Sequence, residues 1–305
     1  MAISAERRKR INRLKKIILG IVVAAIVIPI IICIILASQV VKLRKQVNEL
    51  QALLATSGVM TEEMSGIYTT ASVEESSRGG AIQTGLLNED GQMSAASKEI
   101  YLTFDDGPSS NTNEILDILQ TYNVKATFFV IGKTDEASIR AYQRIVAEGH
   151  TLGMHSYSHK YDEIYQSMDS FTSDLSKLQE YLYQVTGVWP RYYRFPGGSS
   201  NTVSNVDMQE LITYLNENDI VYMDWNIASG DAMGGKIPKE SIISNCLDQI
   251  DQMDECVILL HDIADKDTTV EALPEIIEQI QERGDAVILP VTDGTIPVQH
   301  ITANK

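Results

Sequence analysis

The sequence is poor in cysteine, and this scarcity limits the kinds of site that it can build. Its 305 residues include three cysteines, and no Cys-x-x-Cys motif is present. The missing motif argues against a thiolate metal site. Cys246 and Cys256 are close enough in sequence to close a loop, but spacing alone leaves open whether they form a disulfide or remain two buried thiols.

Basic residues are scarce beyond the N-terminus. The chain has 25 Lys and Arg against 41 Asp and Glu, and seven of the basic residues fall within positions 1–16. The formal net charge of the whole chain is −16, and because residues 1–16 carry +6, the rest of the chain carries −22. Because contact with nucleic acid requires a basic surface, this acidic body excludes nucleic acid as the expected partner.

Charged side chains are absent from Ile17 to Ala37, a stretch dominated by Ile, Val, Leu and Ala. At ~1.5 Å per residue, a helix of this length crosses the ~30 Å hydrocarbon core of a bilayer. A cleaved signal peptide is the alternative, with small residues at Ala37-Ser38, but its apolar region usually runs only ~7–15 residues. The sequence favours an uncleaved transmembrane helix over 17–37. The basic tail, residues 1–16, then predicts a cytoplasmic N-terminus and an extracellular body anchored to the cell membrane.

Two further segments separate this span from a folded domain. Apolar residues follow the span at alternating intervals of three and four, at Val40, Leu43, Val47, Leu50 and Leu54. The pattern predicts a short helical stalk over 38–55, with weak self-association through a coiled-coil seam. Residues 56–97 are rich in Ser, Thr, Gly, Glu and Ala, a composition typical of a flexible linker. A catalytic domain is expected over 98–295, and a tail over 296–305.

From Lys98 onward, short β-rich runs alternate with amphipathic helical patterns. Strands are expected at Ile100–Phe104, Ala126–Ile131, Thr151–His155, Tyr192–Phe195, Ile220–Asn226, Val257–His261 and Ala286–Leu289. Helices are expected between them, near 112–122, 135–149, 168–186, 207–218, 239–252 and 270–283. This alternation predicts parallel βα units, which close as a doubly wound open sheet or as a barrel. Polar residues follow five different strands, which favours an α/β fold of the distorted (β/α)7 barrel type.

Two carboxylates and two imidazoles follow two of these predicted strands. They are Asp105 and Asp106 in Thr-Phe-Asp-Asp-Gly-Pro, and His155 and His159 in His-Ser-Tyr-Ser-His. Two imidazoles and one carboxylate can hold a divalent metal with one coordination position open. The second carboxylate would then be free to act on a water, as in a metal-assisted hydrolase. Taken alone, Asp-Asp-Gly-Pro is also good turn chemistry.

Later strand ends carry further candidates, each with a plainer alternative. Arg194 could orient a carboxylate through a bidentate pair, and the Pro196-Gly197 turn could offer backbone N–H groups to an oxyanion. Trp225 could stack on a sugar face or belong to the core. Asp231 could hold a histidine in position or be a solvated loop residue. His261 ends an apolar strand, where a histidine near a metal can protonate a leaving group.

In their order, these motifs resemble those of the polysaccharide deacetylases of carbohydrate esterase family 4. The resemblance covers roughly residues 98–290 and runs through TFDDGP, HSYSH, RYYRFPGG, a Trp/Asp segment and LLHD. It implies a distorted (β/α) barrel, a divalent metal and hydrolysis of N-acetyl groups from amino sugars. Zinc is the first expectation for the metal, with Co²⁺, Mn²⁺ and Ni²⁺ as alternatives.

The resemblance also implies a role for each motif residue. Asp105 would be the general base and His261 the general acid; Asp106, His155 and His159 would bind the metal; Arg194 would steady the base; and the Pro196-Gly197 turn would supply an oxyanion donor. The chain departs from the family pattern at two positions. Gly197 stands where family members often carry an aromatic residue, and Ala228 where many have an aspartate that tethers the catalytic histidine. Asp231 and Asp262 are the candidates to replace that aspartate.

The expected function is metal-dependent N-deacetylation of an acetylated cell-envelope polysaccharide, with N-acetylglucosamine of peptidoglycan as the first choice. N-acetylmuramic acid, chitooligosaccharides, an exopolysaccharide and acetylxylan remain open as substrates. A non-catalytic carbohydrate-binding barrel is the hypothesis from a different class. The presence of Asp105, Asp106, His155, His159 and His261 speaks against that hypothesis.

Overall fold

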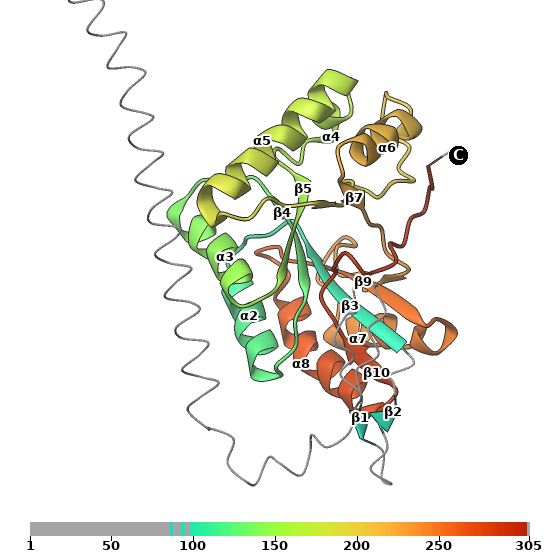
Figure 1. Cartoon of the computed structure of the whole chain (residues 1–305). Helices are drawn as coiled ribbons and strands as arrows, with labels where there is room; N and C mark the ends of the chain where they lie inside the picture. The colour runs from blue at the N-terminus through green and yellow to red at the C-terminus, as the bar shows by residue number, and fades with distance from the viewer. Residues whose placement is uncertain (1–85, 88–92, 95–97, 304–305) are drawn as a thin grey trace, which may run out of the picture. The chain divides into compact units, whose positions relative to one another are not determined.

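Parallel strands form the centre of the folded part of the chain (Figure 1). The computed structural model describes residues 86–87, 93–94 and 98–303. Within these ranges one eight-stranded sheet has the strand order β7-β6-β5-β4-β3-β9-β8, with β10 paired to β3 off this path. Its strands are β3 (Lys98–Asp105), β4 (Thr127–Ile131), β5 (Thr151–Ser156), β6 (Tyr192–Tyr193), β7 (Val221–Tyr222), β8 (Ile227–Ala228), β9 (Glu255–His261) and β10 (Ala286–Ile288).

Helices connect the strands and pack in nearly the same spatial order. They are α2 (Thr112–Thr121), α3 (Glu136–Ala147), α4 (Tyr161–Ile164), α5 (Met168–Thr186), α6 (Met208–Glu217), α7 (Lys239–Leu247), the 3₁₀ helix η1 (Ile250–Gln252) and α8 (Asp267–Glu282). Neighbouring contacts run α7–α8–α2–α3–α5–α6, which follows the strand order. The six helices and seven strands expected from the sequence are present, and α4 and β8 are additional.

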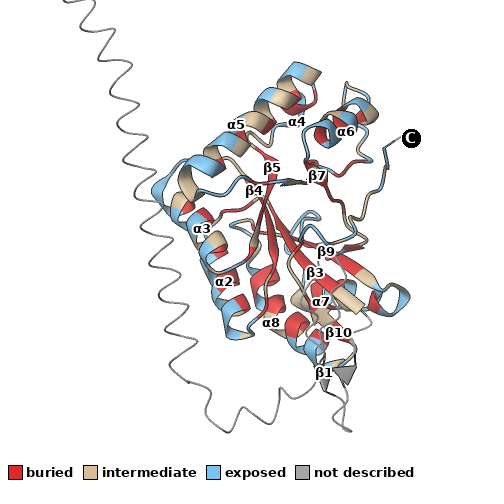
Figure 2. Ribbon diagram, viewed as in Figure 1, coloured by how far each residue is buried: buried red, intermediate tan, exposed pale blue. Residues whose placement is uncertain are grey.

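The central strands β3, β4, β5 and β9 are buried on both faces over most of their length, and alternate side chains point to opposite sides. On β3, Ile100, Leu102 and Phe104 belong to the large core that also contains the buried faces of the helices. Tyr101 belongs instead to a second cluster, with Phe129, Met223, Val257 and Val291. This second cluster fills the concave side of the sheet. Figure 2 shows the result, with buried strands at the centre and helices exposed along their outer faces.

Strand register brings the candidate residues level with one another. Asp105, at the end of β3, pairs in register with His261 on β9 and with Phe129 on β4. Along one edge β3 pairs with β9. Along the other edge it pairs with two strands, with β10 at residues 98–100 and with β4 at residues 103–105. The carboxyl ends of β3, β4 and β9 therefore share one rim, which is where sites gather in parallel barrels.

The sheet is not fully closed by strand pairing. Its path ends at β7 and β8, and no ladder joins these two strands within the described residues. Arg194 spans this end of the sheet, donating from Nε to the carbonyl of Met223 and from a terminal nitrogen to that of Asp224. The fold is thus a parallel α/β half-barrel, consistent with the distorted (β/α)7-type barrel expected from the sequence.

The N-terminal expectations fall largely outside the described ranges. The basic tail 1–16, the transmembrane helix 17–37 and the stalk 38–55 lie there entirely. Among the described helices, none has the length and apolar composition needed to cross a bilayer. Inside the predicted linker 56–97, β1 (Leu86–Leu87) pairs antiparallel with β2 (Met93–Ser94), so part of that segment forms a short ladder.

The last described residues form a strap across the sheet end, within the tail that the sequence predicts over 296–305. This C-terminal strap, residues 298–302, runs toward α6 (Figure 1). Its hydrogen bonds are Asp224 N–H to Val298 O (2.7 Å), His300 N–H to Asp224 Oδ2 (2.8 Å), Ile301 N–H to Ser199 Oγ (3.0 Å) and Tyr222 O–H to Ile301 O (2.5 Å). The strap therefore belongs structurally to the barrel domain.

Cys246 and Cys256 are both free and buried, so they do not form the disulfide that their spacing leaves open. Burial raises the pKa of both thiols, that of Cys256 to about 11, so neither is a ready nucleophile.

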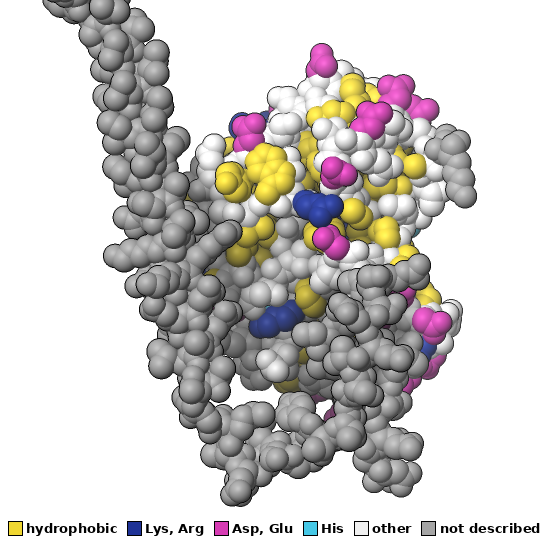
Figure 3. Space-filling view, in the orientation of Figure 1, with side chains coloured by type: hydrophobic (Ala, Val, Ile, Leu, Met, Phe, Trp, Pro, Cys, Tyr) yellow, Lys and Arg dark blue, Asp and Glu magenta, His cyan; other side chains and the backbone are white. Residues whose placement is uncertain are grey.

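On the face in Figure 3, acidic side chains are spread among apolar ones with isolated basic residues between them.

Candidate active site

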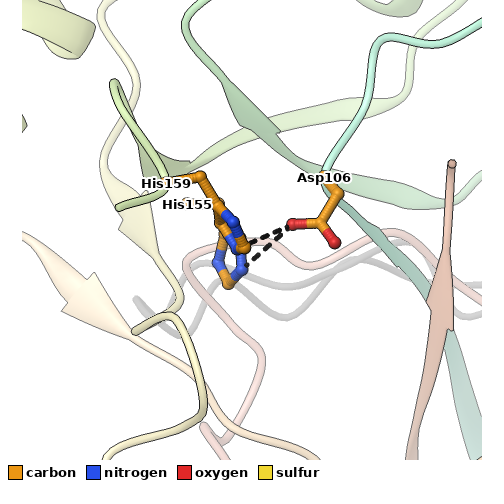
Figure 4. A group of neighbouring side chains, drawn as sticks. All are labelled: Asp106, His155 and His159. Atoms are coloured by element: carbon orange, nitrogen blue, oxygen red, sulfur yellow. Dashed lines mark ion pairs between the residues drawn. The ribbon is translucent and has the colours of Figure 1, made fainter. Parts of the chain in front are cut away.

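Three side chains converge at the rim formed by the strand ends, and we call them the His-Asp cluster: Asp106, His155 and His159 (Figure 4). One donor atom from each lies within 4.8 Å of the others. Asp106 Oδ1 is 3.0 Å from Nε2 of His159 and 3.5 Å from Nε2 of His155. The sequence motifs place these residues after β3 and at the end of β5, and the structure brings them together.

Backbone conformation at the cluster is unusual. Asp106 has φ of 74° and His159 has φ of 52°, both in the left-handed region that non-glycine residues rarely occupy. Such conformations cost of the order of 1 kcal/mol or more and persist where the surroundings impose them, often at functional sites. Two of the three members of the cluster are thus held in costly conformations that aim them at one point.

The tautomer of His155 follows from its partners. Its Nδ1 lies 2.8 Å from the carbonyl oxygen of Arg194, and because a carbonyl only accepts, Nδ1 carries the proton. Burial lowers the pKa of His155, so the ring is neutral near pH 7. Its Nε2 lone pair therefore faces the Asp106 carboxylate. The Nε2 lone pair of His155 and the carboxylate oxygen of Asp106 are both electron-rich, and a cation between them stabilises this arrangement.

The cluster fits a divalent cation on these grounds. Asp106 Oδ1 is buried and accepts no hydrogen bond of regular geometry. Burial alone would raise the pKa of Asp106, but its close contact with His159 outweighs burial and holds that pKa well below its usual range. An ionised carboxylate beside two imidazole nitrogens is the donor set that zinc and similar metals prefer.

A second carboxylate, Asp105, lies beside the cluster but has a different partner. It is 2% exposed and accepts a 2.9 Å hydrogen bond from a terminal nitrogen of Arg194. That same nitrogen donates to Thr103 Oγ1 at 2.7 Å, so the contact with Asp105 is single rather than the bidentate pair that the sequence suggests. Its other oxygen is 3.9 Å from Nε2 of His155. Asp105 is therefore held facing the cluster by a fixed positive charge.

Arg194 itself is fully buried, and all its nitrogens are used. Besides Asp105, Thr103, Met223 and Asp224, its guanidinium contacts the ring of Phe129, 4.3 Å from the centroid. Its backbone carbonyl holds His155, as described above. One residue thus orients a candidate base and a candidate metal ligand at once.

On the opposite side of the rim, His261 pairs with Asp231. Asp231 Oδ1 lies 2.8 Å from Nδ1 of His261, and Oδ2 accepts from the backbone N–H of His261 at 2.8 Å. Thr269 Oγ1 donates to Oδ2 at 2.9 Å and fixes the carboxylate. Burial alone would lower the pKa of His261, but the hydrogen bond and the charge of Asp231 outweigh it and raise that pKa.

Asp262, the other candidate tether for His261, has a different position. It is fully buried and accepts from Ser109 Oγ and Thr112 Oγ1, each at 2.5 Å. A side chain at Gly107 would come within 2.3 Å of its Oδ2, so the turn after the paired aspartates is packed tightly against it. Asp262 therefore fixes the loop between β3 and α2.

The turn that contains Pro196 and Gly197 is packed close to Trp225, since a Cβ at Gly198 would lie 3.1 Å from the Trp225 ring. Gly197 and Gly198 have φ of 79° and 80°, which glycine alone adopts without strain. The N–H of Gly197 donates no hydrogen bond within the described residues. In the same turn, Gly198 donates from its N–H to Phe195 O and Ser199 from its N–H to Asp224 Oδ1, each at 2.7 Å. Trp225 is half-buried and packs against the second cluster, which contains Tyr101 and Phe129, and against the His300 ring of the strap.

Comparison with known proteins identifies the family of this chain. The family model described as polysaccharide deacetylase matches residues 92–215. The catalytic domain of a peptidoglycan N-acetylglucosamine deacetylase from Eubacterium rectale aligns with a TM-score of 0.64 and 38% identity over 68% of this chain and 94% of that one. This chain belongs to the polysaccharide deacetylase family, a family of hydrolases.

Curated members of the family match over a similar extent. A putative polysaccharide deacetylase, YheN of Bacillus subtilis, is 33% identical over 193 residues, which cover 61% of this chain and 65% of that protein. A peptidoglycan-N-acetylglucosamine deacetylase of Bacillus cereus is 32% identical over 191 residues, covering 61% and 67%. The chain thus aligns with about two thirds of the length of each of these curated relatives.

Several residues around the site of this deacetylase-family chain escape sequence reasoning. Asp224 joins Arg194, Ser199 and the strap through its backbone and carboxylate. Thr269 supports Asp231 from the first turn of α8. Neither residue belongs to a recognisable spacing, so the only available signal is that Asp224 lies near the end of the strand predicted over 220–226.

Replacing Arg194 by Met should destabilise this polysaccharide deacetylase family member by about 3–5 kcal/mol, because Asp105 would be left as an uncompensated buried charge. Adding Asp105→Asn should recover part of that loss, since the stranded charge is then gone. Urea unfolding of both variants tests this.

The control is Arg140→Met, which breaks the exposed Arg140–Glu136 pair and should change stability by less than about 0.5 kcal/mol. A double variant no more stable than Arg194→Met alone would contradict the proposed coupling between the two buried charges.

Proposed function

We propose that the protein is a metal-dependent N-deacetylase of an acetylated cell-envelope polysaccharide, with N-acetylglucosamine of peptidoglycan as its first substrate. The observation that carries the proposal is the juxtaposition of three units on one rim: the His-Asp cluster, the Asp105–Arg194 pair and the His261–Asp231 pair. Support for the substrate comes from the Bacillus cereus and Eubacterium rectale relatives, which are named as peptidoglycan N-acetylglucosamine deacetylases.

The metal would be held by Asp106, His155 and His159. Two imidazoles and a carboxylate suit Zn²⁺ first, and Co²⁺, Mn²⁺ or Ni²⁺ could replace it. When bound, a divalent cation supplies Lewis acidity to the acetyl carbonyl and lowers the pKa of water.

The remaining chemistry belongs to side chains and backbone of this chain. Asp105, held in place by its hydrogen bond from Arg194, accepts a proton from the attacking water. As the water oxygen bonds to the carbonyl carbon, the free N–H of Gly197 donates to the developing oxyanion, and Pro196 holds that turn. His261 gives its proton to the amide nitrogen as the C–N bond breaks, which releases acetate and a free amine. Asp231 keeps His261 protonated for this step.

Substrate binding would use the Pro196-Gly197 turn and Trp225, which lie beside the reacting groups. Acetylxylan is the second candidate substrate, because a bifunctional xylanase/deacetylase of Pseudobutyrivibrio xylanivorans is 32% identical over 200 residues, covering 65% of this chain and 30% of that protein. A purely carbohydrate-binding barrel is less favoured, because it would need neither a base held by a buried arginine nor a tethered histidine.

Location follows from the N-terminal sequence as part of the same proposal. The basic tail 1–16 and the apolar segment 17–37 would anchor the protein in the cell membrane with its N-terminus in the cytoplasm. The stalk 38–55 and linker 56–97 would then carry the catalytic domain, residues 98–295 with the strap, outside the cell. Weak self-association through the stalk is compatible with this arrangement.

Asp105→Asn should abolish acetate release while leaving metal content unchanged, because it removes the base and spares the cluster. His155→Ala should abolish both. Acetate release is measured from peptidoglycan, chitooligosaccharides and acetylxylan, with and without a chelator, and bound metal by elemental analysis.

The matched control is Asp248→Asn, an exposed aspartate, which should behave as wild type. Full activity of Asp105→Asn would overturn the mechanism. A wild-type protein that binds no divalent metal and releases no acetate would favour the carbohydrate-binding alternative. The preferred polymer in the panel decides between peptidoglycan and acetylxylan.

Asp231→Asn should move the alkaline limb of the kcat/KM profile to lower pH. In the wild type, Asp231 raises the pKa of His261, so the acid stays protonated to higher pH; without that charge the proton is lost earlier. At the pH of the alkaline limb, kcat/KM should fall by up to about 100-fold, which is the low end of the rate contribution of a general acid. Asp262→Asn, which alters the other candidate tether, should leave the limb in place. If Asp262→Asn moves the limb and Asp231→Asn does not, the assignment is wrong.

A further inference from the structure

An aromatic side chain with no role in the mechanism above lies at the mouth of the site. Tyr161 begins α4, two residues after His159, and its ring centroid is 5.7 Å from that of His159 in an edge-to-face contact. Its exposed fraction is 37%. Among the large apolar side chains exposed in the described part of the chain, it is the one whose ring packs on a member of the His-Asp cluster.

The ring of Tyr161 also faces the Pro196-Gly197 turn. A Cβ at position 197 would lie 3.2 Å from Cε1 and 3.3 Å from the hydroxyl oxygen of Tyr161. Any side chain there would therefore crowd the ring, and the positive φ of Gly197 disfavours one independently. Tyr161 thus occupies the space that a side chain at 197 would need. Its ring therefore contacts both a candidate metal ligand, His159, and the turn that carries the candidate oxyanion donor.

Its neighbour Tyr165 holds this arrangement in place. Tyr165 is buried, donates from its hydroxyl to the carbonyl of Pro196 at 2.9 Å, and has its ring 6.0 Å from that of Tyr161. The Tyr161 hydroxyl makes no hydrogen bond within residues 98–303. The ring is therefore packed against His159 and Tyr165 while part of the side chain stays exposed and its hydroxyl is unbonded among these residues, which is the combination that recognition aromatics offer.

An ordinary surface tyrosine would look different. Tyr183 and Trp189 are more exposed, at 50% and 49%, and their rings contact each other 5.4 Å apart, away from any residue of the site. Tyr161 instead contacts a candidate ligand and the turn that carries a candidate oxyanion donor. Its position is explained by a ligand that enters between those two elements.

We propose that Tyr161 forms the sugar-contacting wall of the site, with its ring against the apolar face of the pyranose that carries the acetyl group and its hydroxyl bonded to that sugar. The inference rests on the proposed deacetylase function and names the residue that selects a sugar ring. It makes Tyr161 a binding residue rather than a proton donor. Loss of the ring should therefore weaken binding of a sugar and leave the chemical step intact.

The test compares Tyr161→Ala, Tyr161→Phe and the control Tyr183→Ala on a chitooligosaccharide. Tyr161→Ala should raise KM about 10-fold, as expected for one lost aromatic contact, with kcat within about twofold of wild type. Tyr161→Phe should fall between it and wild type, since it keeps the ring and loses the hydroxyl. Tyr183→Ala should match wild type. An acetyl ester without a sugar, 4-nitrophenyl acetate, should be hydrolysed equally by all four proteins, and all should bind equal metal.

Two outcomes would overturn the inference. One is an unchanged KM for Tyr161→Ala; the other is a loss of metal with a fall in kcat on both substrates, which would make Tyr161 a support for His159. If wild type releases acetate from no glycan, the proposed function fails instead. Calorimetric titration of the chitooligosaccharide then still tests the wall: weaker binding to Tyr161→Ala than to Tyr183→Ala supports it, and equal binding refutes it.

Discussion

The buried guanidinium of Arg194 is the contact on which the rest of the site depends. Its side chain holds Asp105 and two carbonyls at the open end of the sheet, and its own carbonyl fixes the tautomer of His155. A buried charge of this kind is stable only with all its hydrogen bonds made, so the sheet end, the candidate base and the candidate ligand are specified together. Two adjacent aspartates can then differ in role, because Arg194 neutralises one while the histidines face the other.

His261 is supported in a similar way. Its Nδ1 pairs with the carboxylate of Asp231, which in turn accepts a hydrogen bond from Thr269. Asp224 accepts hydrogen bonds from Ser199 and from His300 of the C-terminal strap. These bonds fix the turn that follows Gly197. Each proposed catalytic group therefore rests on a buried polar partner. Tyr161, in contrast, is held by packing, as suits a residue that meets a substrate rather than reacting with it.

Much of this arrangement can be predicted from the sequence, because parallel strands end at one rim and the motifs follow their strands directly. Asp105, Asp106, His155 and His159 are found in this way. The sequence leaves Asp231 and Asp262 equal as tethers for His261, since the path of a loop decides which carboxylate reaches the ring. The strap over 298–302 has no periodicity, and its order comes from single hydrogen bonds to Asp224 and Ser199. Tyr161 is missed because its position depends on the missing side chain at Gly197, which lies 36 residues later in a different loop.

The division of labour between the two carboxylates is open to a direct test by anomalous diffraction at the zinc absorption edge from crystals soaked in Zn²⁺. One strong peak is expected within about 2.0–2.2 Å of Asp106 and of both cluster histidines. Asp105 should remain bonded to Arg194 and beyond ligand distance from the peak. A peak coordinated by Asp105, or no peak at the cluster, would show that the two carboxylates do not divide the roles in this way.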